Sequence, residues 1–199
     1  NINNFLRFQL TANSGAIYLI FLNFAIGISN LLILLPLHIL WINLIIDGPP
    51  ALAQGFELKN IKRRDLKILD EKTMNVINVN AIFIAIICFI LFVNFYNNYG
   101  YEKALTSVFT LFVFFQCWNA LNARSLNESF YVDINRNKYL TIAIIIAFIF
   151  QLAILFNDTT RKVFSLEKLT FEELILLLIL SFSIILFEEA RKKLKIFIN

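Results

Sequence analysis

The chain has 199 residues, of which 59% are hydrophobic and 15% aromatic, and its mean hydropathy is +0.71. A soluble domain contains about 45–50% apolar residues, so the composition predicts an integral membrane protein. The net charge of +4 comes from connecting segments and the C-terminal tail, and it does not indicate nucleic-acid binding. The two cysteines, Cys88 and Cys117, lie inside apolar runs, where they indicate neither a metal site nor a disulfide framework.

Charged segments separate six apolar runs, at residues 8–28, 31–53, 74–96, 104–122, 139–156 and 171–187. Each is about long enough to cross a hydrocarbon core of about 30 Å as a helix. The sequence therefore predicts an all-α membrane protein, a bundle of six transmembrane helices in one domain over residues 1–199. An even number of spans places both ends of the chain on the same side of the membrane.

Lysine and arginine residues are distributed unevenly between the two sides. One side holds most of them, including those in the 54–73 loop and the C-terminal tail, and the other holds only Lys103, Arg161, Lys162 and Lys168. The positive-inside rule then predicts that both termini and the 54–73 loop are cytoplasmic. This loop is interpreted either as a solvated connector or as a docking surface for a cytoplasmic domain.

The second run contains Asp47, and no other formal charge occurs between residues 8 and 56. A carboxylate at bilayer depth costs about 2.5–3.5 kcal/mol, and such groups usually serve function. The triplet Gly48-Pro49-Pro50 follows at once and is expected to interrupt the helix. A buried acid beside a broken helix is typical of an ion site in a transporter.

Asn43 precedes Asp47 by four residues, so both side chains are expected to project from one helix face. Their oxygens, with carbonyls freed by the interruption, suit a hard cation such as calcium, which takes six to eight oxygen ligands. The sequence has no thiolate or imidazole cluster, which argues against zinc or copper. It also has no phosphate-binding loop or hydrolytic motif, so the chain alone has no visible means of hydrolysing ATP.

Other polar side chains at membrane depth are less specific signals. Asn13 lies in the first run, and Gln116 and Asn119 lie in the fourth. An isolated amide more often forms a hydrogen bond between helices than a ligand site. His38 lies five residues before Asn43, so it faces elsewhere and is interpreted as a packed or interfacial histidine.

The sequence PLHILWINLIIDGPPA at residues 36–51 closely resembles the sixth transmembrane helix of P-type calcium-transporting ATPases. FLRFQLTAN at 5–13 resembles the start of the fifth helix, and FFQCWNALNARS at 114–125 resembles the eighth helix and the following turn. Segments 162–167 and 188–193 resemble the end of the same family. The resemblance runs the length of the chain, and implies the C-terminal membrane half of such a pump.

The resemblance implies calcium export from the cytoplasm, driven by ATP. Its expected partners are membrane lipid and the N-terminal half of the same pump, with four helices and the cytoplasmic domains that bind Mg-ATP. No catalytic or cofactor-binding residue is expected within this segment. Because the sequence starts without methionine, it is interpreted as a piece of a longer protein. Its implied location is a plasma membrane or the secretory pathway.

The resemblance places Asn43 and Asp47 on ion-ligand positions of the sixth helix. Asn13 falls on a fifth-helix position that contributes an amide in two-site pumps, and Gln116 is a weaker candidate ligand. Secretory-pathway pumps are the type that the chain resembles most, and some of them also carry manganese. The implied ion is therefore calcium, with manganese as the alternative.

Three departures from two-site calcium pumps imply a single ion site, a pattern similar to that of plasma-membrane and secretory-pathway calcium pumps. Ala16 and Gln116 stand where those pumps have glutamates, and Ile46 stands where they have a threonine.

Two other interpretations of the chain's function remain open. One is a sodium/potassium or proton pump of the same superfamily, and the other is a free-standing six-helix membrane protein with a structural or regulatory role.

Overall fold

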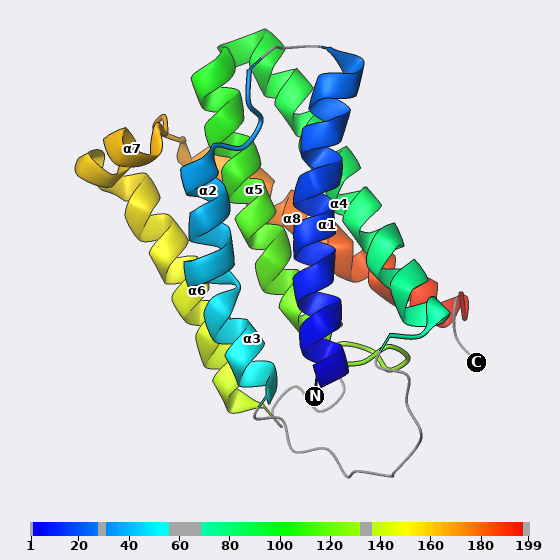
Figure 1. Ribbon diagram of the computed structural model, residues 1–199. Helices are drawn as coiled ribbons and strands as arrows, with labels where there is room; N and C mark the ends of the chain where they lie inside the picture. The colour runs from blue at the N-terminus through cyan, green and yellow to red at the C-terminus, as the bar shows by residue number, and fades with distance from the viewer. Residues whose placement is uncertain (1, 28–30, 56–68, 132–136, 197–199) are drawn as a thin grey trace.

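The computed structural model describes residues 2–27, 31–55, 69–131 and 137–196, and every regular element in these ranges is helical (Figure 1). In chain order the elements are α1 (Ile2–Ile26), α2 (Pro36–Trp41), the π-helix η1 (Ile42–Ile46), α3 (Gly48–Gly55), α4 (Glu71–Tyr99), α5 (Tyr101–Asn122), α6 (Lys138–Phe156), α7 (Asp158–Phe164) and α8 (Phe171–Lys193). The all-helical prediction is confirmed. The predicted 54–73 loop falls largely outside the described residues.

Four helices in these ranges, α1, α4, α5 and α6, are long and apolar enough to cross a membrane by length and composition. The run predicted at 31–53 is divided into α2, η1 and α3, each of them short. Helix α8 has 23 residues, but acidic residues occupy its first turn and basic residues its last. The apolar helices support an integral membrane protein.

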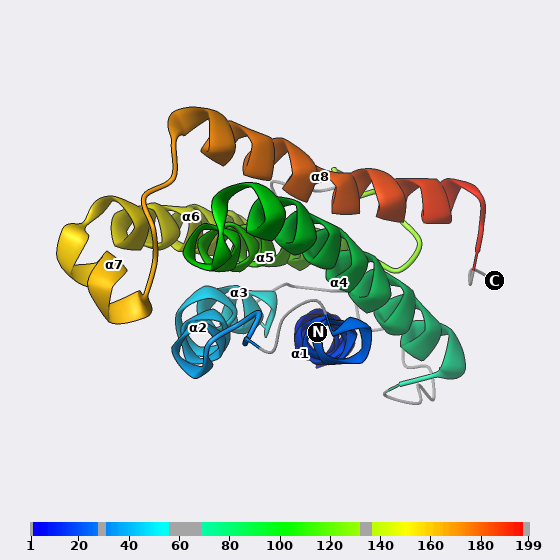
Figure 2. The ribbon, with the colours of Figure 1, turned by 90° about the horizontal axis from the view of Figure 1, so that it is seen from above.

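The helices form three layers when viewed from above (Figure 2). Helix α8 forms one outer layer, α6, α5 and α4 form the middle, and α1 lies beside α2 and α3 in the third. All residues of α5 except Tyr101, Glu102 and Trp118 are buried, because α1, η1, α4, α6 and α8 all pack against it. Helix α5 is therefore the core of the molecule.

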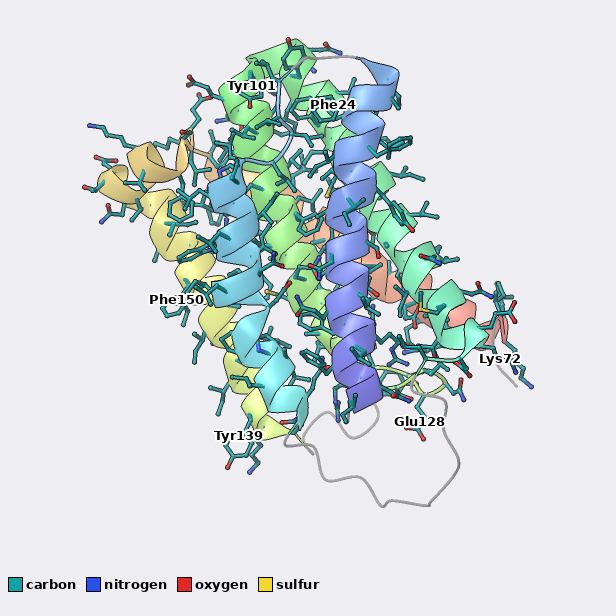
Figure 3. All side chains as sticks on the ribbon, in the orientation of Figure 1. Phe24, Lys72, Tyr101, Glu128, Tyr139 and Phe150 are labelled. Atoms are coloured by element: carbon teal, nitrogen blue, oxygen red, sulfur yellow. The ribbon has the colours of Figure 1, made fainter. Side chains whose placement is uncertain are left out.

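The first and last helices meet at one end of the bundle. The start of α1 and the end of α8 lie at the lower end in Figure 1. Lys72, Glu128 and Tyr139 also lie toward that end, whereas Phe24 and Tyr101 mark the opposite end (Figure 3). At that opposite end a single residue, Gly100, separates α4 from α5, and its φ of +91° explains why glycine is suited there.

Helix α5 ends inside the protein rather than in water. The last carbonyl groups of a helix have no partner within it, and a buried polar group left unpaired costs about 1–3 kcal/mol. Side chains of other helices supply the missing donors. The Gln54 amide donates to the Ala120 carbonyl at 3.2 Å. The Arg7 guanidinium donates to the carbonyls of Asn122, at 3.3 Å, and of Ala123.

The turn that follows α5 is held in the same way. Asn4 of α1 donates to the Arg124 carbonyl at 2.8 Å, and Arg191 of α8 donates to the Leu126 carbonyl at 2.6 Å. Helices α1, α3 and α8 are thus fixed to one buried helix end. None of these contacts could be read from the sequence, because the partners lie far apart in the chain.

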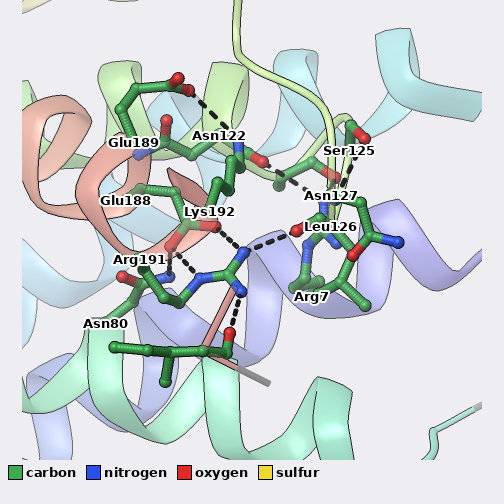
Figure 4. Close-up of polar contacts among 12 residues, drawn as sticks. Arg7, Asn80, Asn122, Ser125, Leu126, Asn127, Glu188, Glu189, Arg191 and Lys192 are labelled. Carbon is green, nitrogen blue, oxygen red and sulfur yellow. Dashed lines mark hydrogen bonds and ion pairs between the residues drawn. The ribbon is translucent and has the colours of Figure 1, made fainter. Parts of the chain in front are cut away.

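A buried ion pair within α8 lies at this end of the bundle, and a hydrogen bond from α4 joins the two helices there (Figure 4). Arg191 contacts both oxygens of Glu188, at 2.8 and 2.9 Å, and the two side chains are only 3% and 1% exposed. Asn80 of α4 donates to the same carboxylate at 3.1 Å. The bidentate geometry and the extra donor satisfy a carboxylate that has no access to water.

We predict that Glu188→Gln lowers the free energy of unfolding by about 3 kcal/mol, because it leaves the Arg191 charge buried without its counter-ion. Denaturation of the purified protein in detergent measures this change. Asp158→Asn is the matched control, since Asp158 is 82% exposed in its ion pair with Arg161, and it should cost less than about 1 kcal/mol. Equal losses in the two variants would contradict the assignment.

Candidate functional site: a buried carboxylate at a helix junction

The chain changes its helical hydrogen bonding immediately before Asp47. The Asp47 amide donates to the Ile42 carbonyl at 2.8 Å, five residues back, and the Ala51 amide then donates to the Asp47 carbonyl at 3.0 Å. Pro49 and Pro50 fall in the first turn of α3, where a missing N–H has no helical partner to lose. The irregular turn therefore lies before the Gly-Pro-Pro triplet, although the triplet was the expected point of interruption.

The prolines also affect the carbonyl groups of this turn. The Ile45 carbonyl would be paired with residue 49 in an α-helix and with residue 50 in a π-helix. Both residues are prolines and carry no N–H. No helical partner is therefore available to this carbonyl in either register. Short π-helical insertions of this kind are frequent at functional sites.

Asp47 is completely buried, and neither of its carboxylate oxygens has a hydrogen-bond partner among the described residues. Asp47 interacts electrostatically with Cys117 of α5, which is also buried. Within the described ranges no group of three or more His, Cys, Asp or Glu side chains could hold a metal ion. A cation at Asp47 would therefore need amide and carbonyl oxygens, together with ligands from elsewhere.

Asn43 and Asn13 share a cavity of about 320 Å³ between α1, the α2–η1 segment and α5. Ala16 and Phe112 also line it, and both asparagine side chains are exposed. Asp47 does not line this cavity. The structure thus brings Asn13 and Asn43 together, while Asp47 lies buried although it is only one turn away from Asn43.

Gln116 is buried in α5 and does not line the cavity. Its side-chain oxygen accepts a 3.5 Å hydrogen bond from Asn119, which also donates to the Phe8 carbonyl at 3.5 Å. The Gln116 amide nitrogen has no partner among the described residues. Asn122 donates to the Ile184 carbonyl of α8 at 3.2 Å. Asn119 and Asn122 thus form the interhelical bonds expected of isolated amides.

His38 packs in the core of the bundle. Its Nε2 lies 2.8 Å from the Phe164 carbonyl, and its Nδ1 lies 3.4 Å from the Leu35 amide. The ring stacks on Phe109 at a centroid distance of 4.2 Å. Both nitrogens are engaged, so the geometry agrees with a packed histidine and leaves no free lone pair for a metal.

A polar chain that positions η1 was not anticipated from the sequence. The Trp41 indole donates to the Gln151 oxygen of α6 at 3.2 Å, and the Gln151 amide lies 3.5 Å from the Thr110 hydroxyl of α5. These contacts fix the residue directly before η1 to two other helices. The sequence feature that could have indicated these contacts is Gln151, a strongly polar side chain within the apolar run 139–156.

A buried carboxylate at a helix junction, in a bundle of apolar helices, is a feature of membrane proteins that handle cations. Residues 31–194 match the family described as "Cation transporting ATPase, C-terminus". The chain belongs to this family, and the resemblance identified in the sequence is confirmed.

Several full-length relatives are similar over almost the whole chain. Calcium-transporting ATPase 1 of Saccharomyces cerevisiae is 33% identical over 202 residues, which cover 96% of this chain and 21% of the relative. Human calcium-transporting ATPase type 2C member 1 is 33% identical, and the match covers 97% of this chain and 22% of the relative. The calcium-transporting ATPase type 2C member 2 of Rattus norvegicus is 32% identical, and the match covers 96% of this chain and 21% of the relative. The chain thus spans about a fifth of the length of these relatives.

We predict that Asp47→Asn does not destabilise the ion-free protein, in contrast to Glu188→Gln. The substitution removes a charge that has no partner in the described structure, and burial of an unpaired charge is unfavourable. The unfolding temperature, measured in detergent with a divalent-cation chelator, should stay the same or rise. A loss as large as that of Glu188→Gln would mean that Asp47 has a stabilising partner.

Proposed function

We propose that this chain is the C-terminal transport segment of an ATP-driven P-type pump that exports calcium from the cytoplasm, with Asp47 as the charged ligand. The observation that carries the proposal is the Asp47 carboxylate, which is fully buried with both oxygens unpartnered among the described residues. The names of the relatives, which are calcium-transporting ATPases, support the choice of ion.

The oxygens near Asp47 suit a hard cation. Asn43 offers an amide oxygen one turn earlier, and the Ile45 carbonyl has no helical N–H partner. Asn13 faces the same cavity as Asn43. Calcium takes six to eight oxygens, so this segment supplies only part of the site. The remaining ligands would come from the N-terminal half of the pump, whose other domains would bind Mg-ATP and carry the phosphorylated residue.

The side chains around this site favour one ion per cycle rather than two. Ala16 lines the cavity with a methyl group, and Ile46 is buried and apolar. Gln116 is neutral, and its oxygen is already bonded to Asn119. These are the three positions at which the family resemblance places the additional oxygens of two-site pumps. A second calcium ion would therefore lack its charged ligands.

The proposed orientation places both termini in the cytoplasm. In this proposal six passes would be formed by α1, the α2–η1–α3 segment, α4, α5, α6 and α8, and these segments run alternately up and down in Figure 1. The basic residues at the end of α8 lie at the same end of the bundle as the start of α1. The membrane would be a plasma membrane or one of the secretory pathway.

We predict that Asp47→Asn in the full-length pump abolishes calcium-dependent phosphorylation by ATP. Loss of the charged ligand should raise the calcium concentration for half-maximal phosphorylation by at least about 100-fold, which corresponds to about 2.7 kcal/mol. Phosphoenzyme formation from labelled ATP measures this, and a parallel manganese titration tests the alternative ion. Normal calcium activation of the variant would refute the site assignment.

The matched control for this experiment is Asp70→Asn. The Asp70 side chain lies outside the helices and caps α4 by accepting a 2.9 Å hydrogen bond from the Thr73 amide. The side chain and amide of Thr73 hold the pKa of Asp70 below its usual range. An asparagine can keep this cap, so calcium activation of the control should equal that of the parent.

We also predict a stoichiometry of one calcium ion per phosphoenzyme. Labelled calcium retained by the full-length pump, divided by the phosphoenzyme formed in the same preparation, gives this ratio directly. A ratio of two would refute the argument from Ala16, Ile46 and Gln116, and it would leave the assignment of Asp47 intact.

A further inference from the structure

A second cavity lies at the end of the bundle where α8 ends, away from Asp47. It has a volume of about 460 Å³ and lies between the last turn of α8 and the segment that follows α5. Asn127 and Tyr131 line it from that segment, and Glu189, Lys192 and Lys193 line it from α8. Most of these residues are polar, unlike those of the cavity beside Asn43.

The ammonium groups of the two lysines in this cavity have unused hydrogen-bond donors. The Lys192 side chain is buried, and its recorded partner is the Glu189 carboxylate at 3.4 Å. That carboxylate also accepts a shorter bond, 2.9 Å, from the Phe130 amide. An ammonium group has three donors, so Lys192 keeps capacity for another acceptor. Lys193 is exposed, and no ion pair is recorded for it among the described residues.

The end of a helix normally repels an anion through its free carbonyl groups, but three of the last four carbonyls of α8 are occupied. The carbonyls of Ala190, Arg191 and Lys192 accept hydrogen bonds of 2.9 to 3.1 Å from the amides of residues 194–196. The Arg191 side chain is engaged by Glu188 and by two carbonyls of the chain. The walls of the cavity are thus fixed. Its charged lining consists of Lys192, Lys193 and the Glu189 carboxylate, and because Glu189 pairs with Lys192, the lining keeps one net positive charge.

The position along α8 matches the headgroup layer of a membrane. The apolar run of α8 ends at Phe187, and Lys192 follows after five residues, or about 7.5 Å of helix. The headgroup layer extends about 5–7.5 Å beyond the hydrocarbon core on each side. Tyr131, which is 64% exposed at the cavity, is a residue typical of this layer.

We propose that this cavity binds the phosphate group of an anionic phospholipid headgroup, with Lys192 and Lys193 as its cationic partners. Asn127 and Tyr131 contribute neutral donors at the rim. A cluster of basic residues directly beyond a transmembrane helix attracts anionic lipid by about 1 kcal/mol per charge. The site is separate from the ion site and does not depend on the proposed transport of calcium.

The test compares lipid binding by the full-length protein and by a Lys192→Gln/Lys193→Gln variant. Native mass spectrometry of protein in micelles with phosphatidylserine or phosphatidylcholine gives the preference for the anionic lipid. The parent should prefer phosphatidylserine, and the double variant should lose roughly 30-fold in that preference. Lys72→Gln, which removes a charge at the same end of the bundle but does not line the cavity, should match the parent.

The test also includes a single-lysine variant and a competition with inorganic phosphate. Lys193→Gln alone alters only an exposed side chain, so it should fold normally and lose roughly fivefold. Inorganic phosphate as a competitor distinguishes a headgroup from free phosphate, and displacement of the lipid by phosphate at similar concentrations would overturn the lipid assignment. Equal binding of both lipids by the parent, or unchanged preference in both lysine variants, would overturn the site. Asp47→Asn should bind phosphatidylserine like the parent, whatever its calcium response.

Discussion

The rest of the structure depends on the buried C-terminal end of α5. A helix that ends within protein cannot give its last carbonyl groups to water, so other helices must bring donors to them. Arg7 and Gln54 do so, from α1 and α3. These two helices flank η1 in the third layer, and their positions fix the space in which η1 lies. The buried position of Asp47 thus depends on the hydrogen bonds that Arg7 and Gln54 make with the end of α5.

Two carboxylates are fully buried among the described residues, and their surroundings are opposite. Glu188 is held by Arg191 and Asn80, and it joins α8 to α4. Asp47 has neither a cation nor a donor among the described residues. Stability alone would favour a partner or an apolar residue at position 47. An unpaired acid at the point where the helix changes register supports the proposed ion site, since local strain and unsatisfied groups concentrate at functional sites.

The sequence predicted those features that depend on local composition. Its charges separate the apolar runs, so the long helices α1, α4, α5, α6 and α8 and the exceptional position of Asp47 could be recognised directly. The π-helical turn could not be recognised from the sequence. Over only four residues, an α-helix and a π-helix would point the side chains of Asn43 and Asp47 in similar directions. The cavity shared by Asn13 and Asn43 depends on how α1 packs beside η1. The contact of Arg7 with residues 122 and 123 joins segments more than a hundred residues apart, and no local pattern encodes it.

An incomplete ion site has an energetic consequence for a pump. A buried carboxylate without a partner is unfavourable in the ion-free state, and a bound cation with its remaining ligands removes that cost. Under the proposed function, the ion therefore stabilises the arrangement in which the N-terminal half completes the site around Asp47. A ligand shifts a conformational equilibrium only by its difference in affinity for the two states. Under the same proposal, Asp47 would provide such a difference, because its charge would be uncompensated until both the ion and the missing ligands are in place.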